Sequence, residues 1–112
     1  MAKLLSNRAL SALTMELSLL LHAGVSVADA LDLLGQEAAY RDVLAGMSEK
    51  ADGGAPLSAC LRESGHFPAY VCGLIEVGEE TGRTEEALSA LSTYYERRTR
   101  LDRQVRSALL YP

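Results

Sequence analysis

Histidine and cysteine, the side chains most often used as nucleophiles and metal ligands, are scarce in this chain of 112 residues. Of the two histidines, only His66 lies between the two cysteines, Cys60 and Cys72. The resulting C-x5-H-x5-C spacing differs from that of zinc sites and lacks a fourth ligand. Both cysteines lie among apolar residues at helical spacing, which favours small buried side chains over a disulfide framework. We therefore expect no metal site.

The remaining polar residues form no recognisable catalytic motif. The sequence contains no nucleophile-elbow, zinc-protease or calcium-loop pattern and no phosphate-binding glycine loop. Its carboxylates fall on predicted solvent-facing helix positions, without a partner that would tune a nucleophile or an acid–base pair. We therefore expect a protein that is not an enzyme and that uses no cofactor.

Arginine is the charged residue whose distribution is most informative. Residues 1–96 hold six basic and fourteen acidic side chains, whereas residues 97–112 hold five arginines and one aspartate. Arginines ahead of an apolar segment, here residues 108–111, are typical of the cytoplasmic approach to a membrane span. The alternative is a solvated helix face whose cations suit the helix macrodipole. The candidate membrane-proximal or partner contacts are Arg97, Arg98, Arg100, Arg103 and Arg106.

Length and composition fit one folded domain. The chain is 48% hydrophobic and 23% charged, and its length suffices for one core. No apolar run reaches the roughly 20 residues of a membrane-spanning helix, and the N-terminus lacks the apolar centre of a signal peptide. We expect residues 1–112 to be a single cytoplasmic helical-bundle domain, excised from a longer membrane protein at the bilayer surface.

Apolar residues recur at helical spacing, and short glycine-containing turns separate the repeats. No segment alternates with the period of a β-strand for long enough to predict a sheet. The sequence predicts an all-α, antiparallel six-helix bundle with a long C-terminal helix leading toward a membrane span. The predicted helices cover residues 6–23, 26–35, 39–52, 57–64, 68–81 and 85–110.

The last predicted helix is the longest and carries an apolar stripe along its whole length. We expect its distal half to project toward the bilayer or to pair with a second copy in a homodimer; the alternative is packing on the first helix. Tyr94 belongs to the stripe and is expected in the core, whereas Tyr95 and Tyr111 are expected as exposed anchors. The stripe consists of Ala87, Leu91, Tyr94, Arg98, Leu101, Val105 and Ala108.

Two turns next to predicted helix ends contain residues with clear conformational roles. Gly24 and Gly82 suit left-handed helix ends, and Gly78 would let two helices approach closely. Glu79 could accept hydrogen bonds from free N–H groups at the start of the last helix; the alternative is contact with a partner. Thr84 is expected to cap that helix.

A helical DNA-binding or regulatory domain is the alternative interpretation. The segment LLHAGVSVADALDLL is typical of a helix, a tight turn and a second helix. However, the second helix carries Asp29 and Asp32 and no cation, so phosphates would repel it. We therefore expect no nucleic-acid partner. A dimeric metal-binding or adaptor bundle unrelated to membranes is the third hypothesis.

Five motifs in register carry a resemblance to a known family, over about residues 10–112. The chain resembles the F-domain family, the inner-membrane platform proteins of type II secretion systems and type IV pilus machines, and is most similar to their first cytoplasmic domain. The similar segments are LLLHAGVSVADALDLL, GGAPLSACL, FPAY, GEETG with the following YYERR, and SALLYP.

The resemblance implies a non-catalytic scaffold at the cytoplasmic face of the bacterial inner membrane. The implied partners are the cytoplasmic secretion or pilus ATPase, other inner-membrane platform proteins, and pilin or pseudopilin subunits. The implied membrane contact is a span that follows this chain. The motif positions are Gly24, Gly78, Glu79, Thr81, Gly82, Tyr111 and Pro112.

Overall fold

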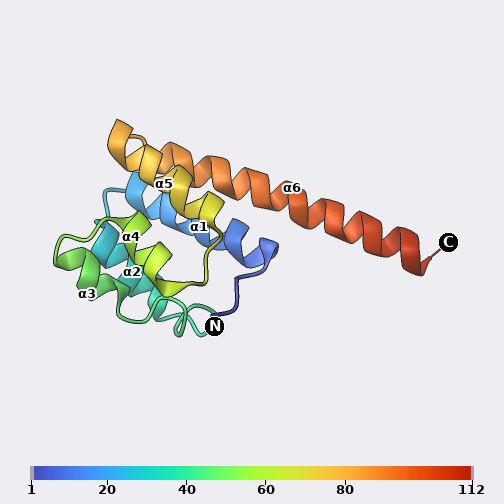
Figure 1. Ribbon diagram of the computed structural model, residues 1–112, viewed down its shortest axis with the longest axis horizontal. Helices are drawn as coiled ribbons and strands as arrows, with labels where there is room; N and C mark the ends of the chain where they lie inside the picture. The colour runs from blue at the N-terminus through green and yellow to red at the C-terminus, as the bar shows by residue number, and fades with distance from the viewer. Residues whose placement is uncertain (1, 112) are drawn as a thin grey trace.

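A computed structural model describes residues 2–111 of the chain (Figure 1). This part of the chain contains six α-helices and no β-strand, which confirms the all-α prediction. The helices are α1 (Asn7–His22), α2 (Val27–Gly35), α3 (Met47–Asp52), α4 (Leu57–Ser64), α5 (Ala69–Thr81) and α6 (Thr84–Leu110).

Local sequence explains most of the helix ends. Ser26 accepts a hydrogen bond from the Asp29 amide at the start of α2, as its capping position predicts. Pro56 and Pro68 directly precede α4 and α5, where a fixed φ suits the helix entry. Gly82 ends α5 with a φ of 71°, a left-handed conformation that glycine adopts without strain.

The core lies between neighbouring helices: α1 packs on α6 and α2, α2 on α3, α3 on α4, α4 on α5, and α5 on α6. Leu13 and Ile75 are fully buried, and so are side chains from every helix. Burial of this apolar surface is the main stabilising term for such a domain. The core residues are Leu10, Leu13, Leu17, Ala30, Leu31, Leu34, Tyr40, Leu44, Met47, Leu57, Cys60, Leu61, Phe67, Val71, Cys72, Ile75, Leu88, Leu91 and Tyr95.

Helices α1 and α6 form the longest pairing, and they run in opposite directions (Figure 1). Ser11 Oγ donates to the Ser92 carbonyl at 3.0 Å, and Ser92 Oγ donates to the Ser11 carbonyl at 2.9 Å. Nearer the α6 N-terminus, Ser18 Oγ donates to the Glu85 carbonyl at 3.1 Å. These small side chains let the two backbones approach while every buried hydroxyl keeps a partner.

The prediction of a third helix over residues 39–52 is wrong over most of that range. Residues 36–46 form successive turns, and α3 begins only at Met47. Gly46 has a φ of 77°, which a right-handed helix cannot contain. Tyr40 and Leu44 are buried as predicted, but consecutive turns position them, with the Leu44 amide donating to the Tyr40 carbonyl at 2.9 Å.

The distal half of α6 extends beyond the packed helices (Figure 1). Every residue from Arg100 to Tyr111 is exposed, including Leu101 at 58% and Val105 at 60%. The molecule accordingly measures 53 × 28 × 24 Å. This confirms the expected projection, although an Asn7–Asp102 hydrogen bond of 3.0 Å ties its first turn to α1. No helix within residues 2–111 has both the length and the apolar character needed to cross a membrane.

Candidate functional site

The turn between α5 and α6 reverses the chain within a few residues. The Arg83 amide donates to the Gly78 carbonyl at 2.6 Å, closing the turn around left-handed Gly82. A Cβ on Gly78 would lie 2.9 Å from both the Ala87 Cβ and the Arg83 carbonyl oxygen. Gly78 is therefore the point of close helix approach that the sequence predicts. Thr81 Oγ1 donates back to the Val77 carbonyl at 2.8 Å.

Glu79 stabilises a helix N-terminus, but a different one from the predicted one. Its Oε2 accepts a hydrogen bond of 3.1 Å from the Ser58 amide in the first turn of α4, and its Oε1 accepts one from Ser58 Oγ. Pro56 at the α4 N-cap provides no side-chain acceptor, so Glu79 supplies the missing one. At α6, Thr84 is the first helical residue, and the N-cap Arg83 makes no side-chain capping bond.

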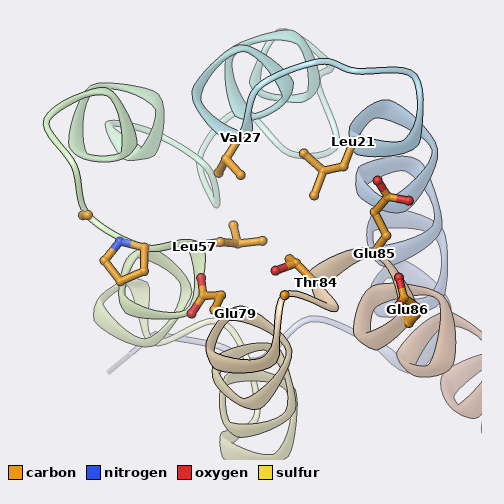
Figure 2. Close-up of a pocket in the computed structure, with 10 residues that line it drawn as sticks. Leu21, Val27, Leu57, Glu79, Thr84, Glu85 and Glu86 are labelled. Carbon is orange, nitrogen blue, oxygen red and sulfur yellow. The ribbon is translucent and has the colours of Figure 1, made fainter.

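An open pocket of about 460 Å³ lies beside this turn, where five helix ends meet. Leu21 of α1, Val27 of α2 and Leu57 of α4 point toward a common space, which Thr84 of α6 also approaches (Figure 2). Ala55, Pro56, Glu79, Gly82, Glu85 and Glu86 complete the lining. The pocket therefore has an apolar interior and carboxylates along its α6 side.

A second hollow of about 220 Å³ shares Glu85 and Glu86 with this pocket. Met15 and Leu19 of α1 line it and are 39% and 59% exposed. His22 Nδ1 lies 3.2 Å from Glu85 Oε2, so a protonated His22 would pair with that carboxylate. We call the two hollows and the shared glutamates the α1–α6 end surface.

The five arginines predicted as membrane or partner contacts are all exposed on the second half of α6. Arg98 is the most structured of them, because its guanidinium lies 5.6 Å from the Tyr94 ring centroid and donates to the Tyr94 hydroxyl at 3.2 Å. Tyr111 is 79% exposed at the end of this helix, and Pro112 lies outside the described residues.

The predicted environments of the two adjacent tyrosines are reversed. Tyr95, predicted as an exposed anchor, is 5% exposed in the core, and burial raises the pKa of its hydroxyl. Tyr94, predicted in the core, is 39% exposed and packs against Tyr70 with the two rings tilted by 55°. The face of α6 that meets α1 contains Leu88, Leu91 and Tyr95, so Tyr95 offers no surface to a partner.

The groups with nucleophilic or metal-binding potential are dispersed. Cys60 and Cys72 are buried free thiols, as predicted, and burial raises the pKa of both. Their neutral thiols are poor nucleophiles. Within residues 2–111, no three histidine, cysteine or acidic side chains are grouped as metal ligands would be.

The structure divides the predicted residues between two places. Gly78, Glu79, Thr81 and Gly82 meet at the α5–α6 turn, whereas the arginines and Tyr111 lie along the projecting helix. Gly24, with a φ of 89°, ends α1 as predicted. Sequence reasoning singled out Glu79, Gly82 and Thr84 of the pocket lining but missed Ser58 and the apolar lining residues. The serine two positions after Pro56 was the available signal for Ser58, because it marks a helix entry.

The chain is similar in sequence to a family of secretion proteins. The family model described as type II secretion system (T2SS), protein F matches residues 13–112. The type II secretion system protein F of Xanthomonas campestris pv. campestris is 34% identical over 110 residues, or 95% of this chain and 27% of that protein.

Pilus proteins are also similar to the chain. The type IV pilus assembly protein TapC of Aeromonas hydrophila is 29% identical over 101 residues, covering 87% of this chain and 24% of its own length. The type 4 fimbrial assembly protein PilC of Pseudomonas putida is 33% identical over 101 residues, with 87% and 25% covered. The chain thus spans about a quarter of the length of these relatives.

Proposed function

Because this chain belongs to the type II secretion system protein F family, we propose that it is a non-catalytic scaffold domain of a membrane platform protein in a secretion or pilus machine. In this role the domain sits at the cytoplasmic face of the bacterial inner membrane. It contacts the assembly ATPase and other platform proteins while pilin or pseudopilin subunits are added. Its six helices act as one antiparallel bundle that α6 connects to a membrane span.

The projecting, arginine-rich half of α6 is the observation that carries this proposal. Its arginines are exposed, and its apolar residues have no cover within the described part of the chain, with Leu109 at 77% and Leu110 at 63% exposure. Each arginine near an anionic bilayer surface contributes about 1 kcal/mol. A helix with this charge pattern suits the approach to a span from the cytoplasmic side.

Co-sedimentation with liposomes containing anionic lipid tests the tether. The variant R98A/R100A/R103A is compared with the unaltered chain at low and physiological salt. Three arginines at about 1 kcal/mol each predict a loss of binding of about 100-fold at low salt. The difference should shrink at physiological salt, since counterions screen exposed charges.

A charge-matched variant separates the tether from general cation attraction. K3A/R41A/R83A also removes three exposed cations but leaves α6 beyond Thr84 unchanged. We expect it to bind liposomes as the unaltered chain does. Equal loss in both variants, or no salt-sensitive binding by the unaltered chain, would contradict a membrane role for α6.

A further inference from the structure

The α1–α6 end surface lies at the opposite end of α6 from the arginine-rich half (Figure 1). Glu85 and Glu86 are in the first turn of α6, whose 27 residues correspond to a rise of about 40 Å. If the far end of this helix approaches a bilayer, the α1–α6 end surface points away from it. It is then the part of the domain most accessible to a cytoplasmic protein.

The chemistry of this surface is both apolar and acidic. Leu21, Val27 and Leu57 form the interior of the larger hollow (Figure 2), and Met15 and Leu19 line the smaller one. The hollows measure about 460 and 220 Å³, and Glu85 and Glu86 line both of them. Such a surface fits a ligand with spaced apolar anchors better than a small polar metabolite.

The three carboxylates at this surface differ in how far their charge is already compensated. Glu79 accepts a hydrogen bond from the Ser58 amide at the α4 N-terminus. Glu85 Oε2 lies 3.2 Å from His22 Nδ1. Glu86 is exposed, and no cation of residues 2–111 lies within ion-pair distance of it. Glu86, and Glu85 whenever His22 is neutral, therefore remain available to attract a cation between the two hollows.

From this geometry we infer that the α1–α6 end surface docks a basic amphipathic helix of a cytoplasmic partner protein. Apolar side chains at helical spacing enter the two hollows, while lysines or arginines between them face Glu85 and Glu86. Such grooves bind helices through anchors at positions i, i+3 or i+4, and i+7. The identity of the partner as a component of the same machine rests on the proposed function, but the docking chemistry does not.

Charge disfavours an anionic bilayer as the occupant, and geometry disfavours a second copy of the chain. An anionic bilayer would be repelled by Glu85 and Glu86. The basic half of α6 from a second copy has suitable chemistry, but placing it here would set the two α6 helices head to tail. Two such helices could not enter one membrane from the same side.

The experiment uses a synthetic helical peptide in which lysines flank leucines at i, i+3 and i+7. A matched peptide carries glutamate in place of each lysine. Chemical-shift changes of backbone amides in the isotope-labelled 112-residue chain report the binding site and the affinity. We expect the basic peptide to perturb residues 15–27, 55–58 and 82–89, and the acidic peptide to leave them unchanged.

Two variants test the two kinds of contact. E85Q/E86Q should weaken binding of the basic peptide about five-fold, because it removes two partly exposed ion pairs, each of which contributes modestly to affinity. Leu19→Ala should weaken it by a similar factor without affecting the core, since Leu19 is 59% exposed. The control D42N/E96Q removes two other exposed carboxylates and should bind as the unaltered chain does.

Several outcomes would overturn the inference. They are perturbations centred on residues 97–111, equal binding of the acidic peptide, or undiminished affinity in E85Q/E86Q. Sedimentation equilibrium that shows self-association abolished by E85Q/E86Q would assign the surface to a second copy instead. If the unaltered chain does not bind liposomes but still docks the basic peptide, the membrane tether is contradicted and this docking surface is supported, so the two failures are distinguishable.

Discussion

Glu79 is a carboxylate that joins the last turn of α5 to the first turn of α4. It lies in the last turn of α5, next to the start of α6, and accepts two hydrogen bonds from Ser58 in α4. The sequence predicts a capping role from its neighbours along the chain. It assigns the wrong helix, because which N-terminus folds back onto α5 depends on tertiary packing.

Removing this acceptor should destabilise the domain. Glu79→Ala leaves the Ser58 amide and hydroxyl without their partner, and we expect the free energy of unfolding to fall by about 1–2 kcal/mol. Urea denaturation measures the change. Glu80→Ala is the control, because the neighbouring Glu80 is exposed and should change stability by less than about 0.5 kcal/mol. Equal effects of both variants would argue against the capping role.

Glu16 is a second carboxylate with an unusual environment. Its Oε2 is buried and has no hydrogen-bond partner among residues 2–111. Burial raises the pKa of Glu16, and the nearby Glu37 carboxylate raises it further. The folded chain therefore binds this proton more tightly than the unfolded chain, so the Glu16 contribution to stability falls as pH rises through the raised pKa.

Replacing Glu16 with glutamine should remove that pH dependence. We expect Glu16→Gln to be more stable than the unaltered chain at neutral pH and similar to it at acidic pH, where Glu16 is already neutral. Urea denaturation across this pH range gives the two curves. Glu96→Gln removes an exposed charge from α6 and should leave the slope unchanged. If Glu16→Gln is less stable than the unaltered chain at neutral pH, the Glu16 carboxylate stabilises the fold and the prediction is wrong.

At the scale of the elements, local patterns predicted five of the six helices to within about two residues. The failure at residues 39–46 has a physical cause: four-residue apolar spacing is also satisfied by consecutive turns, and Gly46 adopts a left-handed φ. The predicted environments of Tyr94 and Tyr95 were reversed for a related reason: α6 has two apolar stripes, and the sequence pattern does not show which of them is buried. Leu101 and Val105 extend the one containing Tyr94, whereas packing on α1 selects the other.

Helix α5 contains two glycines that should respond oppositely to the same substitution. A Cβ on Gly78 would meet Ala87 and the Arg83 carbonyl at 2.9 Å, so Gly78→Ala should cost about 1–3 kcal/mol by separating α5 from α6. A Cβ on Gly73 meets nothing within 4 Å, so Gly73→Ala should stabilise the helix by about 0.5–1 kcal/mol. Thermal unfolding measures both changes. Stabilisation by both substitutions would mean that α5 and α6 can separate without cost.

The whole molecule combines a packed bundle with a helix half that contributes no core. Leu91 is fully buried, whereas Leu101, three turns further along the same helix, is 58% exposed. Leu91→Ala should therefore cost about 2–5 kcal/mol, and Leu101→Ala less than about 0.5 kcal/mol. Urea denaturation again measures the difference. A large loss of stability in Leu101→Ala would indicate that the distal half of α6 is covered in solution, as in a dimer.

The continuity of α6 has a mechanical consequence. The helix contains neither glycine nor proline between Thr84 and Leu110, and one unbroken rod joins the acidic end of the domain to the arginine-rich end. Over a length of about 40 Å, a tilt of about 10° at one end displaces the other by about 7 Å. A small change in the orientation of the bundle therefore moves the far end of α6 by a distance comparable to the width of a helix.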